Sequence, residues 1–75
     1  MEKTYEKEEY PKVHFTEHQL LILQLWSEHA RIKQVAEEMD LSEHTIQTHL
    51  KRMRRKLGVR RTFDVYRYVK EREMI

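Results

Sequence analysis

One capped and strongly amphipathic stretch, residues 42–58 (SEHTIQTHLKRMRRKLG), constrains the fold of this chain more than any other feature. Ser42 is a residue type that caps helix starts, Glu43 suits the first helical turn, and Gly58 suits the left-handed position after a helix. On a period of 3.6 residues, one face carries Ile46, His49, Leu50, Met53 and Leu57. The pattern predicts a single helix with a buried seam and a polar remainder.

The polar side of this predicted helix is basic. Residues 42–61 contain seven lysines and arginines and one acid, Glu43, for a net charge of +6, whereas the whole chain carries only +2. Positive charge gathered in one segment indicates a polyanionic partner. A basic run is usually no more than a solvated helix face, so the interpretation depends on the elements around it.

Composition restricts the chain to one small all-α domain. Its 75 residues include one glycine and one proline, so turn signals are few and helix formers dominate. The absence of cysteine excludes disulfides and thiolate metal sites and fits a reducing cytoplasm. No apolar run approaches the roughly 20 residues that span a bilayer, and the N-terminus is charged, so we expect no membrane partner.

The N-terminal residues predict a tail followed by a long helix. Residues 1–14 alternate acids and bases without an apolar period, which predicts a charged flexible tail or linker before a folded domain at residues 15–75. Thr16 and Gln19 have the spacing of a capping box, and Phe15 precedes them as an apolar staple. The apolar residues that follow crowd more than one face, so this helix, ending near His29, is expected to be central.

The next two elements predict a helix-turn-helix. A short helix at residues 32–39 leads through Asp40 into the basic helix. Small Ala36 lets the two helices cross closely, and Leu41 and Ile46 fill the angle between them. On the second helix of such a motif, a basic face favours double-stranded DNA over a solvated or membrane-surface helix, because the apolar seam is already needed for the core.

A last helix is predicted at residues 63–73, with Thr62 as its cap. Val65, Tyr68 and Val69 share a face that closes the core. A second face is too apolar for solvent on so small a protein, which predicts a homodimer interface. The residues of this face are Phe63, Tyr66, Lys70 and Met74.

Three segments of the chain resemble the LuxR/GerE family of bacterial helix-turn-helix regulators. They are FTEHQLLILQL at 15–25, KQVAEEMDLSEHTIQTHLKRMRRKLGV at 33–59 and RTFDVYRY at 61–68. The resemblance covers about residues 15–74 and implies a four-helix DNA-binding domain, either standing alone or at the C-terminus of a longer regulator. One departure is Gln47, where the family often has lysine, so a different target sequence is expected.

The resemblance also implies roles for individual residues. It implies base contacts in the major groove from Gln47, Thr48 and Lys51. The phosphate contacts that it implies are Lys33, Thr45, Arg52 and Arg55, and the basic run adds Lys56 as a backbone contact. By side-chain chemistry, Lys51 suits the O6/N7 edge of guanine, Gln47 suits adenine, and the Thr48 methyl suits a thymine methyl. Lys51 suits a phosphate equally well.

Two classes of function follow. In the first, the chain is a sequence-specific transcriptional regulator that binds inverted half-sites as a dimer, with residues 43–57 in the major groove. In the second, it is a sigma-factor region-4-like domain or an adaptor that acts through protein contacts, RNA polymerase among them.

Other chemistry finds little support in the sequence. The five histidines lack a carboxylate cluster for metal, and His49 is expected to be a buried histidine with satisfied hydrogen bonds. No phosphate loop, nucleophile elbow or acid/base pair indicates an enzyme or a cofactor.

Overall fold

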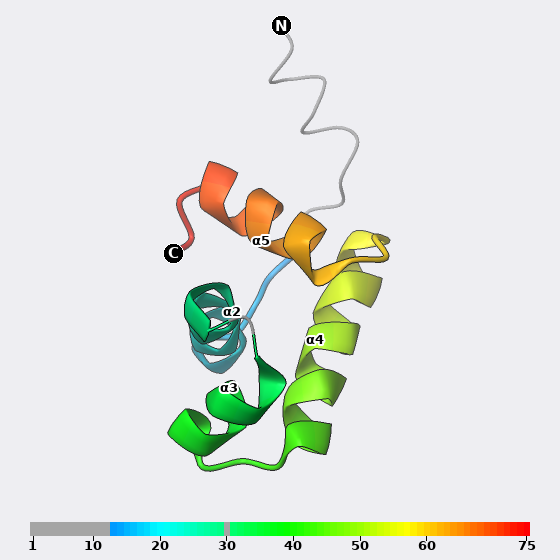
Figure 1. The fold of residues 1–75 in the computed structure, drawn as a ribbon. Coiled ribbons are helices and arrows are strands. Elements are labelled where there is room, and N and C mark those ends of the chain that lie inside the picture. The colour runs from blue at the N-terminus through cyan, green and yellow to red at the C-terminus, as the bar shows by residue number, and fades with distance from the viewer. Residues whose placement is uncertain (1–12, 30) are drawn as a thin grey trace, which may run out of the picture.

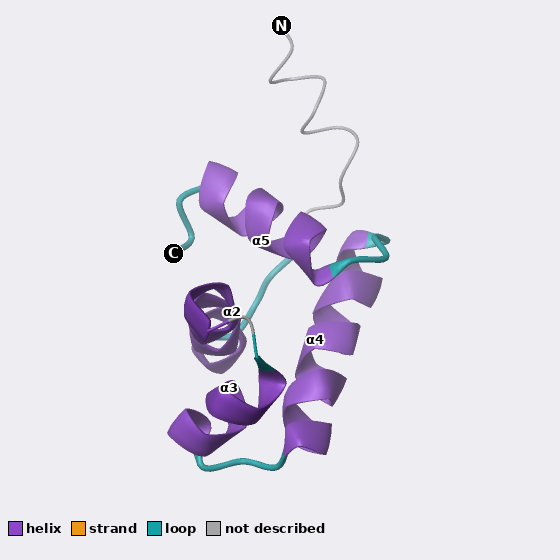
Figure 2. Ribbon diagram, in the orientation of Figure 1, coloured by secondary structure: helices purple, strands orange, loops and turns teal. Residues whose placement is uncertain are grey.

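The computed structural model describes residues 13–29 and 31–75, which form four helices (Figure 1). These are α2 (Glu17–His29), α3 (Ile32–Met39), α4 (Glu43–Leu57) and α5 (Thr62–Glu71). Within the described residues the helices are joined only by loops and turns (Figure 2). The all-α class and the four-helix fold predicted from the sequence are therefore confirmed.

The long helix α2 is the centre of the packing, as its apolar pattern predicts. It contacts α3, α4 and α5, whereas α3 and α5 lie toward opposite ends of α4 (Figure 1). The fully buried side chains from the four helices are Ile22, Leu23, Val35, Ile46, Met53, Val65 and Val69. Contacts with α2, α3 and α5 around one core thus fix the position of α4.

The start of α2 is held by the predicted capping box. The Gln19 N–H donates to Thr16 Oγ1 at 3.0 Å, and the Thr16 N–H donates to Gln19 Oε1 at 3.2 Å. Val13 already packs against the core, and the His14 carbonyl accepts a hydrogen bond from Lys56 Nζ at 2.9 Å. The contacts of the domain thus begin two residues before the predicted boundary at residue 15, and residues 1–12 of the predicted tail lie outside the described residues.

The turn between α3 and α4 has the predicted helix-turn-helix geometry. Asp40 closes α3 in the left-handed conformation with φ 58°, and the Leu41 N–H donates to the Ala36 carbonyl at 2.9 Å. Ser42 then caps α4, because its Oγ accepts the Thr45 N–H at 3.0 Å. Ala36 is buried and belongs to the hydrophobic core.

Helix α5 departs from the sequence expectation at both ends. Thr62 is its first helical residue rather than its cap, and the Thr62 Oγ1 accepts a hydrogen bond from Arg54 Nη1 at 2.8 Å. Arg61 stands at the cap position without a side-chain capping hydrogen bond. At the other end, Glu73 is left-handed with φ 56°, and the Met74 N–H bonds back to Val69. The helix therefore ends at Glu71 instead of Glu73.

Candidate nucleic-acid interface

The three predicted base readers lie together in one groove on α4. Gln47 and Lys51 are exposed and Thr48 is half-buried. All three line a groove of about 420 Å³, which we call the reading groove, at the junction of the four helices. The other residues that line it are Trp26, Ile32, His44, Leu50, Arg54 and Thr62. Reading and packing residues therefore share one concave surface.

The reading groove is basic. Among the described residues that line it, the charged and titratable side chains are His44, Lys51 and Arg54, and none is an aspartate or glutamate. Arg54 is half-buried and held in place by the Thr62 hydroxyl of α5. Without a neighbouring carboxylate, this positive potential is available to an anionic partner.

Sequence reasoning did not include His44 and Arg54 among the base-reading positions. A signal for both exists, because residues 44, 47, 51 and 54 are spaced three, four and three apart, which places them along one side of a helix. Periodicity does not indicate which other helix contacts Arg54. Its hydrogen-bond partner, the Thr62 hydroxyl, belongs to α5. The groove thus contains two more candidates for DNA contact than the sequence indicated.

A second set of α4 residues lies on another side of the helix, and we call this set the far flank. Its members, Thr45, His49, Arg52 and Lys56, are spaced four, three and four apart. The Thr45 hydroxyl accepts a hydrogen bond from Ser42 at 2.9 Å. Lys56 donates to the His14 carbonyl and lies 5.6 Å from the Phe15 ring centroid, so its ammonium group already secures the segment before α2.

The remaining predicted phosphate contacts differ in their surroundings. Arg52 and Arg55 are exposed, and neither forms an ion pair with a residue in the described part of the chain. Lys33 lies apart from them, in a depression of about 480 Å³ that Glu37, Asp40 and Glu43 also line. Three carboxylates beside Lys33 oppose the approach of a phosphate, so the structure does not group Lys33 with the other predicted contacts.

The expectation of a hydrogen-bonded core histidine at position 49 is wrong. His49 is half-buried, and its buried Nδ1 receives no hydrogen bond from any described residue. The His18 ring packs edge-on against it, with ring centroids 5.5 Å apart and an interplanar angle of 84°. Burial, and then the positive charges available at His18 and Arg52, lower the pKa of His49 below its ordinary value.

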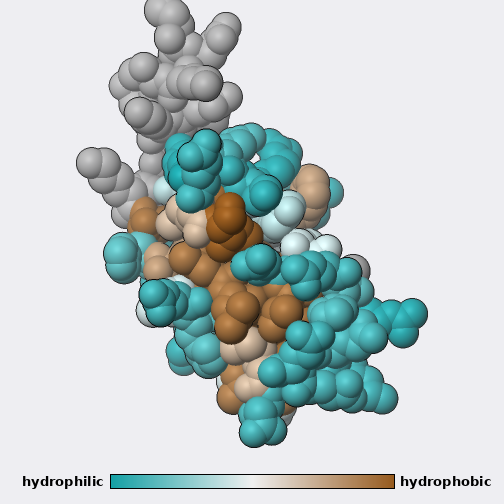
Figure 3. All heavy atoms as spheres, turned by 90° about the vertical axis from the view of Figure 1, so that its left-hand side faces the viewer, coloured by the Kyte–Doolittle hydropathy of each residue, from teal (hydrophilic) through white to brown (hydrophobic). Residues whose placement is uncertain are grey.

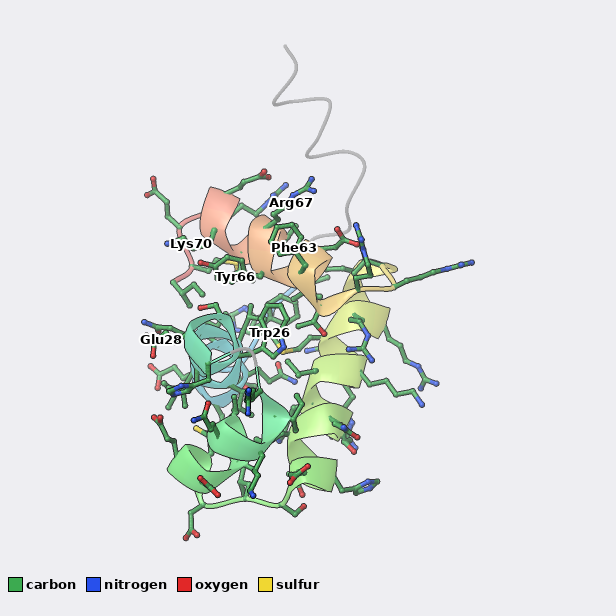
Figure 4. All side chains as sticks on the ribbon, in the orientation of Figure 1. Trp26, Glu28, Phe63, Tyr66, Arg67 and Lys70 are labelled. Carbon is green, nitrogen blue, oxygen red and sulfur yellow. The ribbon has the colours of Figure 1, made fainter. Side chains whose placement is uncertain are left out.

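The predicted interface residues, which lie on α5 and just after it, differ in their exposure. Phe63 is 50% exposed and Lys70 is exposed, whereas Met74 is half-buried. Tyr66 is also half-buried, and its ring centroid lies 6.4 Å from that of Trp26 on α2 (Figure 4). Phe63 is therefore the most exposed of the large apolar side chains on α5.

The surface of the described residues has an apolar region besides the groove. A band of apolar surface crosses the face on the α2 side of the molecule (Figure 3), and on α2 itself Leu21 is 46% exposed. In residues 13–29 and 31–75, no group of three or more histidines and acids is placed to hold a metal. No helix of the described chain is long and apolar enough to cross a membrane.

The fold and this surface define a class of protein. A basic, capped second helix of a helix-turn-helix, mounted on a compact core and open along its polar side, is the arrangement of a DNA-binding domain.

The family comparison agrees with this class. The family model described as "Bacterial regulatory proteins, luxR family" matches residues 13–69. The chain therefore belongs to the luxR family, and it is a DNA-binding helix-turn-helix regulator of transcription. Comparison with curated proteins and with solved structures finds no significant match. The resemblance recognised in the sequence is confirmed.

Proposed function

We propose that the chain is a sequence-specific transcriptional regulator whose helix α4 enters the major groove and reads bases through the reading groove. The observation that carries this proposal is the grouping of Gln47, Thr48 and Lys51 on a capped helix, in one groove whose described charged residues are all basic. Side chains of these types hydrogen-bond or contact base edges that are displayed in the major groove.

Two sets of α4 residues divide the work between specificity and positioning. Gln47, Thr48 and Lys51 are proposed to contact base edges, whereas Arg52 and Arg55, with the hydroxyl of Thr45, are proposed to contact phosphates. Phosphate contacts set the register of a protein on DNA, and base contacts carry the sequence information. The exposure of both arginines and their lack of ion-pair partners in the described chain support this division.

We further propose that two copies associate through α5 on inverted half-sites. Phe63 supplies an exposed aromatic side chain, Lys70 lies exposed one helical turn beyond Tyr66, and Met74 follows. An apolar patch on so small a protein is stabilised when a second copy covers it. The two copies of α4 would then reach half-sites about 34 Å apart, one turn of the duplex.

Selection from a randomised duplex library with the purified chain tests both proposals. We expect an enriched palindrome with half-site centres about 10 bp apart. The enriched duplex should sediment with two protein copies, and the Phe63→Glu variant should bind a single half-site with one copy. Enrichment of no sequence would refute base reading, whereas one half-site bound by one wild-type copy would refute the dimer. Binding that requires RNA polymerase would favour the adaptor alternative.

A further inference from the structure

We propose that the reading groove is also a binding site for a small aromatic anion, and that an anion bound there excludes DNA. The ligand class is a flat aromatic body that carries one carboxylate or phosphate group. The exclusion of DNA rests on the proposed base-reading function, whereas binding of the anion does not.

The size and apolar lining of the groove fit an aromatic body. Its volume of about 420 Å³ lies within the range of roughly 300–1,000 Å³ that is common for small-molecule sites. Trp26, Ile32 and Leu50 supply apolar surface from three helices. Trp26 lies beneath α5, between α2 and α4 (Figure 4), and its contact with Tyr66 restrains the indole ring.

The polar lining of the groove fits a single negative charge. Lys51 and Arg54 line it together with His44, and no acid is among the lining residues in the described part of the chain. The hydrogen bond from Arg54 Nη1 to Thr62 Oγ1 restrains the arginine side chain. A guanidinium group has further N–H donors, which can bind an anion. A charged donor that is already oriented loses little freedom when it binds a carboxylate or phosphate.

Competition with DNA follows from shared residues. Gln47, Thr48 and Lys51 line the groove and are also the proposed base readers. An anion that occupies the groove would cover their polar atoms, and a duplex seated on α4 would close the groove. The two ligands are therefore expected to bind in a mutually exclusive manner.

Titration of the ¹⁵N-labelled chain with 1-naphthoate, followed by NMR, tests the site. The chain contains one tryptophan, so the single indole N–H signal reports directly on the groove. We expect saturable shifts of the signals of Trp26, Thr48 and Thr62, and binding of neutral 1-naphthylmethanol at least tenfold weaker. A parallel titration with 1-naphthyl phosphate shows which anionic group is preferred. When the selected duplex is added to the naphthoate complex, the Trp26 signal should move to the position that it has in the complex with DNA alone.

Two matched variants distinguish a built site from general attraction. Arg54→Gln should weaken naphthoate binding at least fivefold. Arg67→Gln removes the same charge from an exposed position of α5 outside the groove and should leave it unchanged. If Arg54→Gln does not give a folded spectrum, Lys51→Gln takes its place with the same expected loss.

The possible failures are separable. Equal binding of the neutral analogue, equal loss in Arg67→Gln, or shifts without saturation would overturn the anion site. Naphthoate binding that saturating DNA leaves intact would overturn the exclusion. If the chain binds DNA with the selected specificity but not naphthoate, this inference fails alone; if it binds naphthoate but selects no DNA sequence, the proposed function fails instead.

Discussion

The two sides of α4 carry similar residues in different surroundings. On the reading-groove side, Lys51 and Arg54 border a concavity whose other walls come from neighbouring helices, and none of its described lining residues is an acid. On the far flank, Lys56 is already bonded to the segment before α2, and the Thr45 hydroxyl to the helix cap. Formal charge therefore identifies a basic helix, whereas the residues around the helix decide which of its cations remain available.

Removal of the seam that supports both sides should have the largest effect. Leu50 is 3% exposed in the core and also lines the groove. Leu50→Ala should lower the free energy of unfolding by about 2–5 kcal/mol, because a cavity replaces the lost side chain. Urea unfolding measures this change. The proposed base contacts and phosphate contacts of α4 should be lost together. A change below about 1 kcal/mol would show that the seam does not hold α4 in place.

Changes on the groove side should reduce specificity. Gln47→Ala or Lys51→Ala should each cost about 1–3 kcal/mol on the selected duplex and less on a scrambled duplex. The reason is that a lost base contact is specific to the correct sequence. Fluorescence anisotropy with both duplexes at one salt concentration measures the difference. Equal losses on the two duplexes would move Lys51 from the base readers to the phosphate contacts.

A change outside the groove should instead act on all sequences alike. Arg55→Ala should weaken binding to selected and scrambled duplexes by the same factor, because a phosphate contact carries no base information. The slope of log K against log salt should become less steep by about one. If the slope is unchanged, or if only the selected duplex is affected, Arg55 does not have the proposed role.

The smallest effect concerns stability on the far flank. The pKa of His49 is lower in the folded chain than its ordinary value of 6.5. As the pH falls through 6.5, the unfolded chain takes up this proton first, so the free energy of unfolding is greatest above that pH and decreases below it. The His49→Gln variant should show a shallower decrease in thermal stability between pH 7.5 and 5.5.

His44→Gln is the matched control, because it removes an exposed histidine from the groove side of the same helix. This variant should keep the acid sensitivity of the wild type. If it flattens the pH dependence as much as His49→Gln does, the lowered pKa of His49 is not the cause.

Local signals predicted much of the fold. The bounds of α3 and α4, the Thr16–Gln19 capping box and the left-handed Gly58 agree with the sequence reading, because caps and periodicity act within a few residues. The predicted cap at Thr62 is wrong, because the helix already begins at Thr62, whose hydroxyl bonds to Arg54 of a different helix. For His49, periodicity indicated partial burial but not the ring of His18 that faces it.

By itself, the sequence determined the four helices, the buried seam of α4 and the concentration of positive charge beside it, since each depends on residues close along the chain. Only the tertiary structure decided which polar side chains share a groove, which cation secures Phe15, and which lysine lies among acids. Lys56 and His14 are 42 residues apart, and the groove has walls from four helices. Such neighbours are set by packing, and packing depends on all the buried faces at once.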